Sequence, residues 1–365
     1  MKILVFSLHF VEYAVELANA ISKENKVHLV LSAPKVSNTL KNDLGKILSE
    51  KVSYTLIEKY SGKNPLILIN FFKTLALLIR FRPDIIHYQE ARDVSNLMIL
   101  VCSRFIPIVA TIHDVLPRFS KTCRYVSLLT WFSKNIRKYL YHKIIVHGFV
   151  LKEELVKNIG RPDDIVIIPH GCLTSFVRQT SAAREEPHTL LFFGRMEKYK
   201  GLKYLIDAEP IVSREIPDFK IIIAGSGEDL SLNISLIKDN RHFEIHDRYI
   251  PNDEVSEFFC RSSAVVLPYS TASQSGIVGM AYVFGKPVIV TNVGSLPEAV
   301  ENDKSGIVIP PNDTESLAKA IIQMIRDEGR RKRMGDYAMN TAKNELSWEN
   351  AAKLTQKVYK ECLAH

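Results

Sequence analysis

Strand-length apolar runs alternate with amphipathic helical patterns along almost the whole chain, and this alternation most limits the folds open to it. In the first half, strands are predicted near 2–7, 27–31, 85–89, 108–113, 143–147 and 165–169. Helices are predicted between them, near 11–23, 66–80, 94–104, 126–141 and 149–159. Strands that alternate with helices favour βαβ units, and hence a parallel sheet that is buried on both faces.

The pattern breaks into polar residues around 174–187 and then restarts, with Arg184-Glu185-Glu186-Pro187 as the expected linker. Further strands are predicted near 189–194, 219–224, 243–246, 264–268, 287–291 and 306–309. Further helices are predicted near 201–214, 252–262, 276–284, 314–327, 330–345 and 347–362. We therefore expect two Rossmann-like, doubly wound α/β domains, 1–182 and 183–346, whose parallel sheets face a central cleft.

Composition is that of a soluble globular protein, and 365 residues are enough for two cores. The five cysteines are scattered and form no C-x-x-C pair, which favours reduced thiols and a cytoplasmic protein. The chain begins with a strand-like run, so no signal peptide is expected. The apolar segment 65–79 is interrupted by Lys73 and is too short to span a bilayer, so a buried or interfacial helix is predicted.

Positive charge is concentrated in the first half of the chain. Residues 1–184 hold 26 Lys and Arg against 14 Asp and Glu, although the whole chain carries a net charge of only +8. The segment 118–143 is basic, contains interleaved aromatic residues and has no acidic residue. Such a segment suits an anionic membrane surface, a lipid-phosphate acceptor or a nucleic acid, or it is simply a solvated helix face. No recognition motif supports nucleic acid as a partner.

The loop from Phe193 to Gly201 is the first candidate for chemistry, because it follows a predicted strand and precedes a predicted helix. Arg195 offers a planar fork and Lys200 a point charge, which together suit a diphosphate. Fixed cations would stabilise the charge that builds on a leaving nucleoside diphosphate. Ordinary surface ion pairs are the alternative interpretation of both residues.

Two further loops follow predicted strands. Ala224-Gly225-Ser226-Gly227 would let the backbone approach a ligand closely, although a tight turn needs the same small residues. The stretch 267–278, which includes Gln274, Ser275, Gly276 and Ile277, would direct helix N-terminal amides at an anion. Ser273 or Ser275 could equally be a helix N-cap.

In the first half, Thr111-Ile112-His113-Asp114 ends a predicted strand, where a neutral imidazole could hydrogen-bond a sugar hydroxyl. His87, His147 and His170 also end predicted strands. Several imidazoles at one sheet edge would suit a metal, but no D-x-D or supporting carboxylate spacing occurs, so no metal or other cofactor is expected. The turn after the first strand lacks G-x-G-x-x-G, and the chain has no P-loop, which weakens a dehydrogenase or NTPase interpretation.

Taken together, these motifs resemble the retaining glycosyltransferase family 4, of GT-B fold. The resemblance covers nearly the whole chain, and its motifs are individually weak but specific in this order. They are Thr111-Ile112-His113-Asp114, Lys152-Glu153-Glu154-Leu155, Ile168-Pro169-His170-Gly171, Phe193-Gly194-Arg195, Lys200-Gly201, Ala224-Gly225-Ser226-Gly227, Gly285-Lys286-Pro287-Val288-Ile289, Gly294-Ser295-Leu296-Pro297-Glu298 and Ser347-Trp348-Glu349.

The resemblance implies that the second domain binds a nucleotide-diphosphate sugar. Arg195 and Lys200 would hold the diphosphate, and His113 of the first domain would reach the donor sugar. The other donor-site residues that it implies are Gly225, Tyr249, Ile250, Gln274, Ser275, Gly276, Ile277, Met280 and Glu298. His9 and Phe10 would shape the acceptor side, and the last helix, 347–365, would cross back onto the first domain.

The chain departs from the family in two places. The family usually has two glutamates eight residues apart, and Ala272 and Met280 stand at those positions. The second glutamate ordinarily grips the nucleotide ribose, which a methionine cannot do. The first turn also lacks the family's usual paired glycines and has His9-Phe10 instead.

The expected function is therefore metal-independent sugar transfer, with retention of configuration, to a glycan, lipid-linked or small-molecule acceptor. The site would need no metal because Arg195 and Lys200 neutralise the diphosphate. The protein would be cytoplasmic, or peripheral on the inner face of a membrane. A non-catalytic GT-B partner subunit and a GT-B sugar epimerase are the alternatives.

Overall fold

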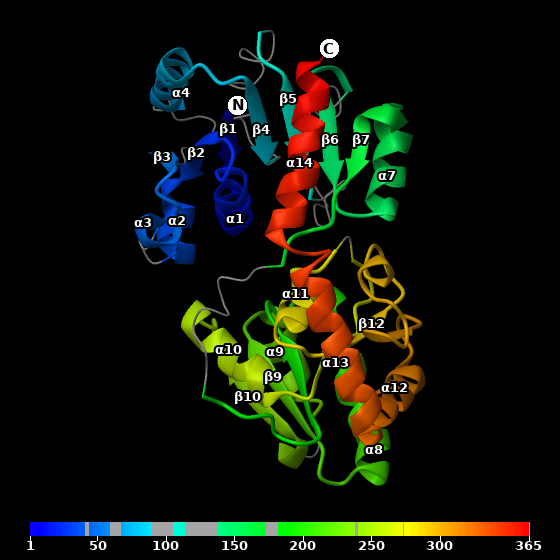
Figure 1. Ribbon diagram of the computed structural model, residues 1–365. Coiled ribbons are helices and arrows are strands. Elements are labelled where there is room, and N and C mark those ends of the chain that lie inside the picture. The colour runs from blue at the N-terminus through cyan, green and yellow to red at the C-terminus, as the bar shows by residue number, and fades with distance from the viewer. Residues whose placement is uncertain are drawn as a thin grey trace, which may run out of the picture. The chain divides into compact units, whose positions relative to one another are not determined.

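The computed structural model divides the chain into two compact units, Met1–Pro169 with Trp348–His365, and His170–Ser347 (Figure 1). The described residues are 1–40, 44–58, 67–89, 105–113, 138–172, 182–237, 240–272 and 274–364. Each unit is a parallel α/β sheet with helices packed against it, as the strand–helix alternation predicts. The GT-B-type pair of Rossmann-like units is thereby confirmed.

The first unit contains a seven-stranded sheet of order β3-β2-β1-β4-β5-β6-β7. Its strands are Lys2–Ser7 (β1), Lys26–Ser32 (β2), Val52–Ile57 (β3), Ile85–Gln89 (β4), Ile108–Thr111 (β5), Lys143–Val146 (β6) and Ile165–Ile167 (β7). Its described α-helices are Val11–Ile21 (α1), Ala33–Leu40 (α2), Leu44–Ile47 (α3), Ile67–Phe81 (α4), Phe149–Ile159 (α7) and Trp348–Leu363 (α14).

The second unit contains a six-stranded sheet of order β10-β9-β8-β11-β12-β13. Its strands are Thr189–Phe193 (β8), Lys220–Gly225 (β9), Phe243–Asp247 (β10), Ala264–Leu267 (β11), Val288–Thr291 (β12) and Gly306–Ile309 (β13). Its described α-helices are Leu202–Glu215 (α8), Glu228–Ile234 (α9), Asn252–Arg261 (α10), Gly276–Val283 (α11), Thr314–Arg326 (α12) and Glu328–Lys343 (α13).

Successive residues of the central strands pack into different apolar clusters. Leu190 and Phe192 of β8 join one cluster of the second unit, whereas Leu191 joins the other. Because side chains alternate across a strand, these clusters lie on opposite faces of the sheet. Both faces are therefore buried, which explains why the strands read as continuous apolar runs rather than as alternating ones.

All twelve predicted strands are present, and a thirteenth, β3, was missed. β3 lies at the edge of its sheet, and Tyr54 and Leu56 are exposed, so it lacks the continuous burial that marks the others. The short helices α2, α3 and α9 were also missed. The helix predicted at 94–104 and most of that at 126–141 lie outside the described residues.

The last helix, α14, belongs to the first unit and lies along its sheet (Figure 1). Its Trp348 ring meets Tyr13 of α1 edge-on, with ring centroids 4.9 Å apart. The chain thus passes from the first unit into the second after Pro169 and returns at Trp348. The first unit is therefore assembled from two segments that are far apart in the sequence.

One ion-pair network fixes the edge strand β10 of the second unit. The Arg261 guanidinium, at the end of α10, donates to the Glu244 carboxylate of β10 at 2.6 and 2.8 Å. It also donates to Glu186 at 2.6 Å. The bonds from Arg261, aided by His246, lower the pKa of Glu244 to about 2 against the opposing effect of burial.

This network predicts pH-dependent stability of the second unit. The pKa of Glu244 in the folded protein lies below the model-peptide value of 4.5. Its stabilising contribution is therefore complete above pH 4.5 and is lost as the pH falls toward 2. Glu244→Gln should lower the free energy of unfolding by about 1 kcal/mol at pH 7, because solvent screens a partly exposed pair, and by less at pH 3.5.

Urea unfolding at the two pH values measures this difference. Glu315→Gln is the matched control, because both side chains of its pair with Lys319 are 79% exposed and the atoms are 4.0 Å apart. That variant should lose little stability at either pH. An equal loss for Glu244→Gln at both pH values would contradict the assigned role of the carboxylate.

Candidate donor and sugar sites

The strand order of the second unit reverses at β8, because the chain builds outward on one side through β9 and β10 and on the other through β11. Connections from β8 and β11 therefore leave the sheet in opposite directions. In open α/β sheets such a switch point leaves a crevice at the carboxyl ends of the strands, and ligands bind there. The loops that follow β8 and β11 are two of the three loops that the sequence singled out.

Lys200 lies at this crevice beside Gly194. The Lys200 side chain is buried, with 6% of the residue exposed, and its ammonium donates to the Phe193 carbonyl at 3.3 Å. The ammonium also lies 5.5 Å from the centre of the Tyr269 ring. A Cβ placed on Gly194 would stand 2.8 Å from Lys200 Nζ and 3.2 Å from Ile277 Cδ1. The absence of a side chain at Gly194 therefore leaves room for the ammonium next to the start of α11.

Burial, together with the nearby positive charge of Arg195, lowers the pKa of Lys200 to about 8 against the opposing effect of the Glu197 charge. Arg195 itself is 83% exposed along its side chain and pairs with Glu197 at 3.2 Å. One buried and one exposed cation thus share a loop. An anion that bound between them would relieve the repulsion and raise the pKa of Lys200.

Glycines bring three loops of the second unit into backbone contact. A Cβ on Gly201 would lie 1.9 Å from the Pro268 carbonyl oxygen, and one on Gly225 would lie 1.9 Å from the Gly194 carbonyl oxygen. Both residues have positive φ angles, 73° and 144°. Only glycine fits such a close approach, so the loops after β8, β9 and β11 converge because these positions have no side chain.

The loop after β11 leads into the N-terminus of α11. Ser275 is the N-cap, and its Oγ accepts from the Ile277 amide at 3.3 Å; the capping interpretation of Ser275 is thus correct. The Ser270 amide donates to the Tyr199 carbonyl at 2.7 Å, which ties this loop to that of Lys200. Gly276 is exposed and Gln274 is half-buried, so the first turn of α11 presents backbone amides at the crevice. Ser273 lies outside the described residues.

The remaining predicted donor residues fall into two groups. Tyr249, just after β10, is exposed, as is Glu298. Ile250 and Met280 are buried in the apolar cluster that also holds Tyr269, and Ala272 packs against that cluster. Met280 therefore presents neither a hydrogen-bonding group nor an exposed surface where the family usually has a ribose-binding glutamate.

In the first unit, His113 follows β5 and is surrounded by aromatic rings. Phe10 stacks on the imidazole, with centroids 3.8 Å apart and planes 24° apart. Tyr13 and His147 each lie 4.9 Å from it by ring centroid. His9 is half-buried in the turn before α1. Phe10 and His113, predicted separately, are thus brought together in one cluster.

Sequence reasoning missed the residue that holds this imidazole. Nε2 of His113 is 2.8 Å from Oε1 of Gln89, the last residue of β4. Gln89 is fully buried, although it ends a strand. A polar side chain two residues after His87 on a buried strand was the available signal, since residues i and i+2 share a face.

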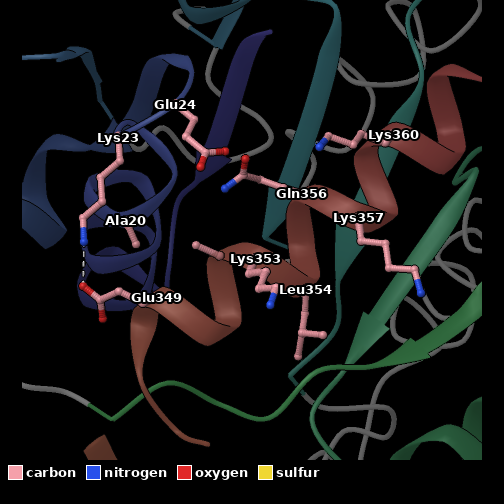
Figure 2. Close-up of a pocket in the computed structure, with 10 residues that line it drawn as sticks. Ala20, Lys23, Glu24, Glu349, Lys353, Leu354, Gln356, Lys357 and Lys360 are labelled. Carbon is pink, nitrogen blue, oxygen red and sulfur yellow. Dashed lines mark hydrogen bonds and ion pairs between the residues drawn. The ribbon is translucent and has the colours of Figure 1, made fainter. Parts of the chain in front are cut away.

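A groove of about 560 Å³ lies elsewhere on the first unit, between α1 and α14 (Figure 2). At this groove Lys23 forms an ion pair with Glu349, with 2.8 Å between Nζ and Oε1. The groove is also lined by Lys353, Lys357 and Lys360, which follow one another along α14. The α1 side of the groove is formed by Ala20 and the turn that leads into β2. The groove therefore lies at the carboxyl end of α1, where the chain returns to the amino ends of the strands. His113 lies at the opposite edge of the sheet, beyond the carboxyl end of β5.

The fold and these loops define an α/β protein that places a buried lysine, an exposed arginine and the start of α11 at the switch point of its second sheet, an arrangement that suits an anion. Family models match both halves: Glycosyltransferase Family 4 over residues 11–176, and Glycosyl transferases group 1 over residues 174–341. The chain therefore belongs to the GT4-like glycosyltransferases of GT-B fold.

Individual proteins agree with this family. An uncharacterized glycosyltransferase of Methanocaldococcus jannaschii, MJ1607, is 30% identical over 60% of each chain. A glycogen synthase of Mycobacterium tuberculosis is 26% identical over 76% of this chain and 69% of its own length. The structure of Anabaena Alr3699/HepE in complex with UDP and glucose superposes with a TM-score of 0.77 at 15% identity, covering 99% and 100% of the two chains. The alignment with MJ1607 spans only 60% of the length of that protein.

The glycine contacts predict that Gly201→Ala disrupts the crevice. Its Cβ would overlap the Pro268 backbone, which cannot move without displacing the loop after β11. The positive φ alone costs about 1–2 kcal/mol for alanine, and the overlap should add about 1–3 kcal/mol to the loss in the free energy of unfolding.

Gly285→Ala is the matched control for this variant. Its φ of 63° is similar to that of Gly201, but its Cβ would meet only the flexible tip of Met339, at 2.8 Å. Chemical denaturation should therefore show the larger loss for Gly201→Ala. Equal losses would mean that the backbone contact with Pro268 is not a constraint.

Proposed function

We propose that the protein transfers a sugar from a nucleoside-diphosphate sugar to an acceptor hydroxyl, with retention of configuration and without a metal. The single observation that carries this proposal is the buried Lys200 ammonium at the switch-point crevice, beside Arg195 and the first turn of α11. A buried cation with a depressed pKa is costly unless an anion completes its surroundings. A diphosphate is an anion of suitable charge.

In this mechanism Lys200 and Arg195 stabilise the charge that develops on the leaving diphosphate as the bond from the sugar anomeric carbon to oxygen breaks. The acceptor oxygen forms the new bond on the same face of the sugar. The acceptor proton passes to an oxygen of the departing diphosphate, so atoms and charge balance without a protein base. The amides at the start of α11 supply further donors to the phosphate or the sugar.

The nucleotide sugar is supported by the relatives, since HepE was determined with UDP and with UDP-glucose. The exposed Tyr249 suits stacking against a base. Because Met280 is buried and apolar, the ribose must be held by other groups. We therefore expect weaker nucleotide binding than a ribose-gripping glutamate would give.

The acceptor is proposed to be a lipid-linked glycan at the cytoplasmic face of a membrane. Most of the basic stretch 118–143 lies outside the described residues, but α4 offers a second, fully described support. Ile69, Phe72, Leu75 and Ile79 are exposed on one side of α4, with Phe72 62% and Ile79 66% exposed. The buried side includes Asn70 and Thr74. Leu78 and Phe81 on that side join the core of the first unit, so α4 carries large apolar side chains on its outward side as well as toward the core.

The positive charges on α4 favour binding to an anionic surface. Lys73 and Arg80 are exposed beside the apolar stripe, and the helix has no acidic residue. An apolar stripe flanked by cations suits a helix that lies in the headgroup region of an anionic bilayer. Among the described residues, no helix has both the length and the apolar character needed to cross a bilayer, so docking of this kind would be peripheral.

The rival function, a non-catalytic partner subunit, is favoured by Ala272 and Met280, where the family usually has glutamates. The two functions differ in one measurable result. A transferase releases nucleoside diphosphate from its donor, whereas a scaffold subunit releases none. A screen of UDP-, GDP- and ADP-sugars by thermal shift identifies the donor first, because a ligand that prefers the native state raises its Tm.

Lys200→Ala is expected to reduce kcat/KM for the donor by about 10²–10³-fold, the cost of losing one preorganised charge-stabilising group. In the native protein, diphosphate affinity should fall as the pH rises above about 8, where free Lys200 loses its proton. Calorimetry with UDP, GDP or ADP should show proton uptake on binding in this range. Lys200→Ala should abolish both the fall in diphosphate affinity at high pH and the proton uptake on binding.

Lys203→Ala is the matched control, since Lys203 lies in the first turn of α8 but is 59% exposed and pairs with Asp207 at 2.5 Å. It should keep near-normal turnover and the pH dependence. All assays contain EDTA, so that no stray metal substitutes for the lost charge. Turnover by Lys200→Ala at the control's level would remove the basis of the proposed function.

The membrane proposal predicts that the protein floats with vesicles of phosphatidylglycerol and phosphatidylcholine at low salt. Phe72→Glu combined with Ile79→Glu should abolish flotation, because two carboxylates would enter the apolar stripe. Leu232→Glu is the control, since Leu232 is 65% exposed but lies on α9 of the second unit, so its carboxylate would stand outside α4. Flotation that survives the double substitution, or fails in the native protein, would count against α4 as the docking surface.

A further inference from the structure

A chain of buried hydrogen bonds runs from α14 through β4 to His113. The Tyr359 hydroxyl of α14 forms a short hydrogen bond with Nδ1 of His87. Nε2 of His87 is 2.7 Å from the Thr111 hydroxyl and 3.1 Å from the Gln89 amide nitrogen. Oε1 of Gln89 is 2.8 Å from Nε2 of His113. Every member of the chain is buried.

The fold makes this chain continuous. His87 and Gln89 are two residues apart on β4, so their side chains lie on one face of the sheet. In the register of β4 and β5, Gln89 stands opposite Thr111, and His113 follows two residues later. α14 packs on the same face and brings Tyr359 to His87, with ring centroids 5.6 Å apart. The side chains of three elements are thus joined by direct hydrogen bonds.

The chemistry of the groups fixes the protons. An amide oxygen only accepts, so Nε2 of His113 must donate to Oε1 of Gln89. The amide nitrogen of Gln89 only donates, so Nε2 of His87 must accept and the proton of His87 is on Nδ1, toward Tyr359. Burial lowers the pKa of His87 to about 3, so His87 stays neutral and this arrangement persists across the physiological pH range.

We infer that Gln89 is a positioning residue: when His113 is uncharged, Gln89 holds it in the Nε2–H tautomer, with Nδ1 as the nitrogen that accepts. This tautomer makes Nδ1 a hydrogen-bond acceptor, which suits the contact between His113 and the donor sugar that the family resemblance implies. Stacking on Phe10 and the edge of Tyr13 fix the plane of the ring, while Gln89 fixes its protons. The functional part of this inference rests on the proposed function; the tautomer itself does not.

The titratable groups that face His113 among the described residues include Tyr13 of α1, His147 after β6 and His170; one ring nitrogen from each of the three histidines lies within 4.8 Å of the other two. Burial raises the pKa of Tyr13 well above its usual value, so its hydroxyl stays neutral at working pH. Gln89 of β4 is neutral at every pH. A carboxylate at position 89 would therefore be a new charge against the imidazole, which makes Gln89→Glu an informative variant.

The first test is 15N NMR of the full-length protein labelled in histidine, without substrate. The His113 signals are assigned by their loss in His113→Gln. The native protein should show a protonated Nε2 and an unprotonated Nδ1, and Gln89→Leu should show a mixture of tautomers. A native His113 protonated on Nδ1, or an unchanged tautomer in Gln89→Leu, would overturn the inference whether or not a donor sugar is known.

The second test is the pH profile of donor turnover. Gln89→Leu should lower kcat by about 10–100-fold with a smaller change in KM, the usual cost of losing a group that orients a functional imidazole. Gln89→Glu keeps the acceptor and favours the imidazolium, so the acid limb of kcat should move about 1 unit to higher pH. If the acid limb of kcat has the same pH midpoint in Gln89→Glu as in the native protein, Gln89 has only a structural role.

Thr55→Val is the matched control. It removes a hydroxyl that bonds Nε2 of the buried His28 at 2.9 Å in the same sheet, remote from His113 in the strand order. It should change stability but neither the acid limb nor the His113 spectrum. If the native protein turns over no nucleotide sugar, the proposed function fails, and the NMR result alone still decides the role of Gln89.

Discussion

The candidate donor site depends on one close approach, that of Gly201 to the Pro268 carbonyl, which brings the loops after β8 and β11 together. These loops follow the two central strands at which the sheet order reverses. Were they held apart by a single methyl group, Lys200 would lose its position beside Gly194 and the start of α11. There the buried ammonium has a carbonyl and an aromatic face as its neighbours.

The two units use their sheet edges differently. In the second unit the groups at the carboxyl edge are charges and backbone amides, which suit an anion. In the first unit they are neutral: an imidazole, an amide and aromatic rings, connected by hydrogen bonds of fixed direction. One edge stabilises charge, and the other directs hydrogen bonds at an uncharged ligand. This division agrees with a reaction in which a nucleotide leaves and a sugar is transferred.

Much of this fold was predictable from the sequence, because strands buried on both faces leave long apolar runs. β3 escaped because edge strands do not need that pattern. Lys200, Gly194 and Ser275 were found because they lie within short motifs. Gln89 and Tyr359 were not, because their roles come from register and from the return of α14, which no local pattern records. The family motifs equally could not show that Met280 is buried.

The return of α14 to the first unit has a consequence for how the chain is made. Tyr359 and Trp348 are buried against β4 and α1, so the first unit stays incomplete until α14 has been synthesised. The second unit is one continuous segment and meets no such delay. During synthesis the segment made later can therefore reach its native packing first. The hydrogen bonds that run from Tyr359 to His113 can then form only after α14 has been made, which ties the orientation of His113 to the presence of α14.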